Sequence, residues 1–276
     1  MIQETLGVLG ITPVFLKTSF EVSLISLFFV CLAHSFATHG WKRTVREFTA
    51  GFFLTAFCES TGVLSGAYIY PGFRFYVFAT PVANPASWIA TVYIIIEVTN
   101  RIVYGKKALA TYEADGNRML QRDFTLFSGS FWKTLVVLAL ADAVFALVVD
   151  LVMDPLATIY NWWVWVPCEP GVTQIGPGVV DPYNFTRQVF MTTPQTWIGD
   201  FFAQFFPHGL RYPTRVLGIP LINFLAWLVF VFVFALEFRW VEFQEKWGDL
   251  KKTAVLWGLI LLDVPVLALV LIVPNI

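Results

Sequence analysis

Long apolar stretches separated by short polar segments dominate this chain. A helix that crosses a bilayer needs about 20 mostly apolar residues, and six stretches reach that length. They cover about residues 19–38, 46–66, 82–104, 132–153, 216–238 and 254–273. The pattern predicts an all-α fold, a polytopic bundle of about six transmembrane helices, with residues 1–276 forming a single integral membrane domain.

The composition supports a membrane protein. Hydrophobic residues make up 57% of the chain and charged residues only 13%, whereas soluble domains carry about 25% charged residues. The mean hydropathy is +0.69. The net charge of -1 gives no reason to expect a nucleic-acid partner. We expect membrane lipids to surround the chain.

The basic residues predict the orientation of the bundle. Most of the 18 Lys and Arg residues lie in the linkers after the first, third and fifth predicted helices. Cytoplasmic loops are enriched in Lys and Arg, so these linkers are expected on the inner side. The prediction is a multi-pass protein, of the cell membrane, with both termini on the outer side.

One linker, at about residues 155–215, is much longer than the others and falls on the predicted outer side. Proline and glycine are frequent in its first half. Its second half carries an apolar face at helical spacing, which predicts a short interfacial helix over residues 195–206. A loop packed against the bundle explains the same pattern and remains the alternative.

Acids, amides and aromatic residues recur at one depth of the predicted bundle, close to its outer face. Ionisable side chains inside a membrane are costly, so they usually face the bundle interior and mark a functional path. The candidate catalytic residues are Glu59, Asp142, Asp150 and Asp154, and the candidate substrate-binding residues are Tyr68, Tyr70, Asn84, Trp88, Trp163, Asn223 and Trp227.

The carboxyl groups suit acid catalysis. Asp150 and Asp154 are four residues apart and share a helix face, and Asp142, two turns earlier, could line the same broad face. Burial disfavours the charged carboxylate, so at least one of these groups could hold a proton near neutral pH. Each residue also has a structural explanation. The acids and amides could join helices or cap helix ends, and the aromatic residues could pack or lie in an interfacial belt.

The histidines and cysteines predict no metal site and no cofactor. His34, His39 and His208 include no pair at helical ligand spacing. Cys31, Cys58 and Cys168 are far apart and lack a CxxC motif, which argues against both a zinc site and a disulfide framework.

Several motifs resemble a carotenoid-biosynthesis membrane family. Residues 59–62 (ESTG) and 66–70 (GAYIY) are similar to its E-x-x-G…G-x-Y-x-Y pattern. The family includes γ-carotene 1′,2′-hydratase and bisanhydrobacterioruberin hydratase. Further similarities are Pro81 with Trp88, residues 150–155 (DLVMDP) with Trp163 and Trp165, and residues 218–224 (GIPLINF) with Trp227.

The resemblance implies a lyase that hydrates a terminal isoprenoid C=C bond without a redox cofactor. It implies a hydrophobic polyene substrate from the bilayer, and other carotenoid-pathway enzymes as possible partners. Such a reaction protonates an alkene and needs aromatic faces around the resulting cation. In our hypothesis Asp150 or Asp142 donates the proton and Glu59 orients water. Tyr68, Tyr70 and Trp163 form the wall that faces the cation.

Other functions fit the same residues. Intramembrane acids also serve proton-coupled transporters. A non-catalytic lipid-binding or pigment-binding protein is a second alternative. A third is another isoprenoid enzyme, a cyclase or isomerase, because the same cation can lose a proton in place of capturing water.

Overall fold

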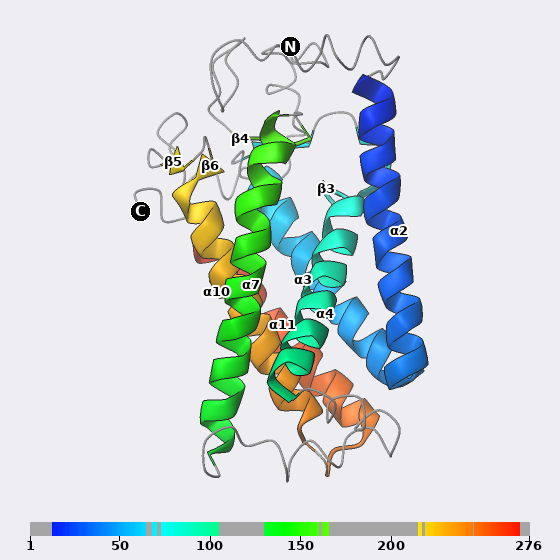
Figure 1. Ribbon diagram of the computed structural model, residues 1–276, viewed down its shortest axis with the longest axis vertical. Helices are drawn as coiled ribbons and strands as arrows, with labels where there is room; N and C mark the ends of the chain where they lie inside the picture. Colours follow the sequence, from blue (N-terminus) through cyan, green and yellow to red (C-terminus); the bar gives the residue numbers. More distant parts are fainter. Residues whose placement is uncertain are drawn as a thin grey trace.

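The structure is a computed structural model that describes residues 13–64, 68–70, 73–104, 130–159, 162–165, 215–216, 219–244 and 246–270. Six long helices make up most of these residues. They are α2 (Pro13–His39), α3 (Trp41–Leu64), α4 (Ala83–Tyr104), α7 (Phe131–Ile159), α10 (Leu221–Glu242) and α11 (Asp249–Val270). The prediction of an all-α helix bundle is confirmed (Figure 1).

The helices have the length and composition of membrane-spanning segments. Four of them are long and apolar enough to cross a bilayer: Phe15–His39, Ala83–Tyr104, Phe131–Thr158 and Leu221–Glu242. The other two, α3 and α11, are of similar length, with 24 and 22 residues, but begin with several charged residues. The protein is therefore embedded in a membrane, in agreement with the sequence-based prediction.

The distribution of side chains between surface and interior also suits a bilayer. Large apolar side chains such as Phe29 and Val30 on α2 and Val148 on α7 are more than half exposed. Charged side chains such as Arg46 and Asp142 are buried. Water would penalise this arrangement, whereas hydrocarbon favours apolar groups outside and paired polar groups inside.

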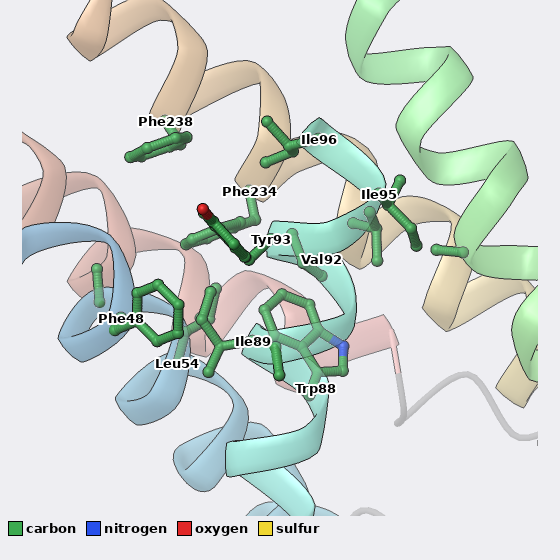
Figure 2. Packing of buried hydrophobic residues seen from close by; sticks show 14 of the residues in the cluster. Phe48, Leu54, Trp88, Ile89, Val92, Tyr93, Ile95, Ile96, Phe234 and Phe238 are labelled. Atoms are coloured by element: carbon green, nitrogen blue, oxygen red, sulfur yellow. The ribbon is translucent and has the colours of Figure 1, made fainter. Parts of the chain in front are cut away.

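The main core lies where α3, α4 and α10 converge. Figure 2 shows Phe48 and Leu54 of α3 packed beside Trp88 and Ile89 of α4, with Phe234 of α10 behind them. Gly51 allows this close approach. A Cβ at position 51 would lie 2.8 Å from Cγ1 of Ile89 and 3.2 Å from Cζ of Phe234, so a larger residue would push α3 away from both neighbours.

Short antiparallel strand pairs gather at one end of the bundle, which we call the strand end (Figure 1). They pair β1 (Tyr68–Ile69) with β4 (Val164–Trp165), β2 (Tyr76–Val77) with β3 (Thr80–Pro81), and β5 (Arg215–Val216) with β6 (Ile219–Pro220). Two-residue strands have no readable periodicity, so the sequence pattern does not predict them.

Several helices extend beyond their predicted ranges, and α7 does so through a proline. The apolar pattern ended near residue 153, but α7 continues through Pro155 to Ile159. A proline removes one helical hydrogen bond, and membrane helices tolerate this where neighbouring groups satisfy the freed carbonyl. The predicted interfacial helix at 195–206, and most of the 155–215 linker, lie outside the described residues.

Candidate functional site

The Glu59 carboxylate is the centre of a hydrogen-bond chain at the strand end. Its Oε2 accepts hydrogen bonds from the hydroxyl of Tyr68 at 2.7 Å and from the hydroxyl of Tyr70 at 2.5 Å. The amide nitrogen of Asn84 donates in turn to the Tyr70 hydroxyl. Two donors on one oxygen fix the orientation of the carboxyl group.

The local fold brings these groups together from three elements. Glu59 lies near the end of α3, and Asn84 lies in the first turn of α4. The strand β1 carries Tyr68, which faces Trp165 across the β1–β4 pair. Pairing with β4 therefore holds the two tyrosines over the end of α3.

The Tyr70 hydroxyl remains a hydrogen-bond donor over a wide pH range. Burial, and next the nearby Glu59 carboxylate, raise the pKa of Tyr70 well above its usual value near 10. The position of Tyr70 is also fixed through its backbone, because the hydroxyl of Tyr76 donates a hydrogen bond to the Tyr70 carbonyl at 2.7 Å.

Two aspartates form a second polar group beside the first. Asp150 and Asp154 are buried on one face of α7, and their carboxyl groups contact each other. The amide nitrogen of Asn223 donates to Oδ2 of Asp150 at 3.1 Å and also to Oδ2 of Asp154. The Trp163 indole is a further hydrogen-bond partner of Asp154. Two carboxyl groups in contact in an apolar interior do not both ionise, so such a pair retains a proton.

A mainly apolar cavity adjoins these polar groups. The centre of a water-sized sphere can move through about 60 Å³ of it, so the cavity admits a small group. Asn223 contacts both the cavity and the aspartate pair. The lining residues are Thr55, Cys58, Glu59, Tyr68, Trp88, Trp165, Asn223, Ala226, Trp227, Val229 and Phe230.

Aromatic rings form much of the cavity wall. The ring centroid of Trp88 lies 4.8 Å from that of Phe230 and 6.2 Å from that of Trp227. At the polar end the rings of Tyr68 and Trp165 are 4.8 Å apart. Aromatic rings, here in tilted and edge-on pairs, stabilise a cation that forms near their faces.

Asp142 does not belong to this site. Its carboxylate forms a two-pronged ion pair with Arg239, with Oδ2 2.8 Å from Nε and Oδ1 3.1 Å from Nη2, and Asn100 accepts a third hydrogen bond from the guanidinium. Eight residues separate Asp142 from Asp150, or about 12 Å along a helix axis. Asp142 and Asp150 are both buried inside the bundle, but Asp142 is not among the residues that line the cavity, and its catalytic role stays a prediction. The fifth predicted span ends at residue 238, whereas α10 continues to Glu242 and carries Arg239 inside the bundle.

The remaining predicted residues divide between the cavity and its surroundings. The structure places Glu59, Tyr68, Trp88, Asn223 and Trp227 on the cavity wall. Tyr70, Asn84, Asp150, Asp154 and Trp163 contact those wall residues or one another behind the wall.

Several residues of the site were missed. Trp165 and Phe230 line the cavity, and their sequence contexts resemble ordinary packing positions. Glu21 of α2 accepts hydrogen bonds from the backbone N–H groups of Arg74 and Phe75, which anchors the segment that leads to β2. An acid in the middle of an apolar stretch was the signal that could have identified Glu21.

Comparison with known proteins does not assign this chain to a family. No protein-family model, no curated protein and no solved structure matches this chain. Among the residues that the structure describes, no group of three or more His, Cys, Asp or Glu side chains is arranged to hold a metal ion.

Proposed function

We propose that this protein is a membrane-embedded hydratase that adds water to a terminal C=C bond of an isoprenoid polyene. The observation that carries the proposal is the meeting of three features in one place. A carboxylate oriented by two phenols, an aspartate pair joined by Asn223 and a cavity walled by aromatic rings lie together inside an apolar bundle.

The proposed reaction uses these groups in sequence. The Asp150–Asp154 pair lies behind Asn223, which lines the cavity. A water molecule beside Asn223 takes up the proton of the pair as it gives one to the less substituted alkene carbon, and the π electrons form the new C–H bond. The positive charge is left on the tertiary carbon, beside the rings of Trp88 and Trp227. Water held by Glu59 attacks that carbon, and Glu59 accepts the proton that the new C–O bond releases.

The net reaction adds one water molecule to each double bond. Its product is a tertiary alcohol. Glu59 gains the proton that the aspartate pair loses, so passing one proton back to the pair restores the starting state. Neither an oxidant nor a reductant is needed, which agrees with the resemblance to carotenoid hydratases. The carotenoid as substrate rests on that resemblance, carried here by Glu59, Gly62, Tyr68 and Tyr70.

We also propose the cell membrane as its location, with the strand end facing outward. Basic side chains such as Lys42, Lys133 and Lys251 lie at the opposite end of the helices, and an excess of basic residues is typical of the cytoplasmic side. The site would then lie near the outer surface, where water can reach it.

A proton-coupled transporter is the main competing function. It would need ionisable residues that can bind and release ions in the inner half of the bundle. Asp142 pairs with Arg239 there, and Arg46 pairs with Glu242 at 2.5 Å. Mutually paired charges suit a structural role better than a path that must bind and release ions. Proton flux in proteoliposomes, if coupled to a solute, would favour the transporter.

Expression in a carotenoid-producing host tests the proposal directly. We expect pigments whose mass increases by one water per acyclic end group. The expected gain disappears in Glu59→Gln and in the double variant Asp150→Asn/Asp154→Asn. Unchanged pigments with a folded wild-type protein, or full hydration by both variants, would exclude the proposed reaction.

A further inference from the structure

The cavity reaches the surface of the bundle on the side of α10. Val229 is 40% exposed, whereas Thr55, Cys58, Trp88 and Trp165 on the opposite walls are buried. Of the described lining residues, Val229 is the most exposed, and Ala226, Trp227 and Phe230 of the same helix are partly exposed. The cavity therefore has its open edge at Val229.

This open edge lies at the depth of the hydrocarbon. Val229 is eight residues after the start of α10 at Leu221, which places it about 12 Å along the helix from the strand end. The hydrocarbon layer of a bilayer is about 30 Å thick. An opening at that depth faces lipid chains and not water.

The polarity of the cavity changes along its length. Asn223, in the first turn of α10, and Glu59, near the end of α3, supply the polar groups close to the strand end. Val229 and Phe230, deeper along α10, supply only apolar surface. A ligand with one reactive end and a long apolar chain matches this gradient in a single orientation.

The packing of the helices leaves room for such an entrance. α3 and α10 supply most of the cavity wall, and in the described residues their backbones approach each other at few points. Each backbone lies closest to other helices, α3 to α4 and α11, and α10 to α7 and α11, while side chains such as Arg46 and Glu242 bridge the two. The space between the two backbones near Val229 is therefore filled by side chains, which can move without shifting either helix.

We propose that the substrate enters sideways from the bilayer, between α3 and α10 at Val229. It enters end first, and the rest of its chain stays among the lipids. This inference rests on the proposed hydration. The cavity offers only about 60 Å³ to the centres of water-sized spheres and so holds an end group and not an entire carotenoid. The protein therefore recognises the end group and accepts linear isoprenoids of different length. Each end of a symmetric polyene is then hydrated in a separate binding event.

Narrowing the opening tests the route. Val229→Trp is compared with Val148→Trp, a matched change at a lipid-exposed valine of α7 that is 55% exposed. Each purified variant, in lipid vesicles, receives either an acyclic carotenoid or a monoterpene alcohol with the same dimethyl-substituted double bond. We expect Val229→Trp to slow carotenoid hydration about tenfold or more, because the long chain must remain in the opening. The short alcohol passes through completely and should react at nearly the wild-type rate.

The outcomes separate this inference from the proposed function. Undiminished carotenoid hydration by Val229→Trp, or an equal loss with both substrates, would overturn lateral entry. A wild-type protein that hydrates neither substrate would overturn the hydratase itself. If the tryptophan prevents folding, Val229→Leu is the milder variant. It must reduce the hydration rate of the carotenoid more than that of the alcohol. Val148→Trp should leave both rates unchanged.

Discussion

Gly62 lies directly against the ring of Tyr68. A Cβ at position 62 would come within 2.5 Å of Cζ and 2.6 Å of Cε1 of that ring, far inside van der Waals contact. The glycine lets the phenol cross the end of α3 and reach Oε2 of Glu59. The spacing of acid, glycine and tyrosine in the sequence thus has a physical reason, because the ring needs the space above the glycine.

Gly62→Ala should displace the Tyr68 ring. We expect a loss of about 1–3 kcal/mol in the free energy of unfolding, as for other overpacked positions, together with slower hydration. Gly258→Ala is the matched control, because nothing lies within 4 Å of a Cβ there. Since alanine favours a helix over glycine, the control should be neutral or gain about 0.5–1 kcal/mol. Thermal unfolding in detergent measures both. Equal unfolding temperatures and equal turnover for the two variants would contradict the close contact.

Tyr70→Phe should weaken the orientation of Glu59. The variant removes one of two phenol donors to Oε2 and the acceptor of Asn84. A hydrogen bond to a charged group contributes about 1.5–3 kcal/mol, so we expect about a 10- to 100-fold lower hydration rate with little change in folding. Tyr76→Phe, which removes only a bond to the Tyr70 carbonyl, should cost less.

The pH profile gives a second test of the Tyr70 phenol. Because burial and Glu59 raise its pKa, Tyr70 stays protonated as the pH rises through the usual range of tyrosine, near 10. The wild-type rate should therefore show no fall caused by phenol ionisation below about pH 10. A fall in that range that Tyr70→Phe abolishes would contradict the assignment.

The sequence predicted the helices well because the bilayer itself sets their length. The apolar stretches at about 82–104 and 216–238 became Ala83–Tyr104 and Leu221–Glu242. The four-residue error at the end of α10 had a large consequence. It put Arg239 outside the bundle and left Asp142 without its partner.

The periodicity of the sequence does not predict contacts between segments that are distant in the chain. The shared helix face of Asp150 and Asp154 follows from spacing alone, but their bridge through Asn223 joins α7 to α10 across 69 residues. The pairing of Tyr68 with Trp165 depends on tertiary packing in the same way. Neither leaves a local pattern that a single sequence reveals.

The Asp142–Arg239 ion pair should stabilise the bundle and take no role in the reaction. Asp142→Asn and Arg239→Met each leave a buried charge unpaired, which costs about 3–5 kcal/mol. The double variant Asp142→Leu/Arg239→Met should regain most of that stability. Hydration per folded molecule should change little in the double variant. A stable double variant without activity would return Asp142 to the catalytic candidates.

The proposed orientation can be read from cysteine labelling. Phe75, exposed at the strand end, and Lys246, exposed at the opposite end, are each replaced by cysteine in a background with Cys31, Cys58 and Cys168 changed to alanine. A membrane-impermeant maleimide added to intact cells should label position 75 and not position 246. Labelling of position 246 alone would invert the topology and place the site at the cytoplasmic face.

The Asp150–Asp154 pair gives the sharpest distinction between a catalytic and a structural role. Two carboxyl groups in contact, buried in an apolar bundle, share one proton and keep at most one buried negative charge. An asparagine at either position leaves a neutral pair, so Asp150→Asn and Asp154→Asn should unfold at or above the wild-type temperature. Each should nevertheless lose about 10²- to 10⁴-fold in hydration rate, because the remaining aspartate no longer shares a proton with a neighbour. The double variant should be little worse than either single variant, since the pair acts as one acid. Lower unfolding temperatures with activity retained per folded molecule would identify the pair as structural, and the proton donor would then have to be another group.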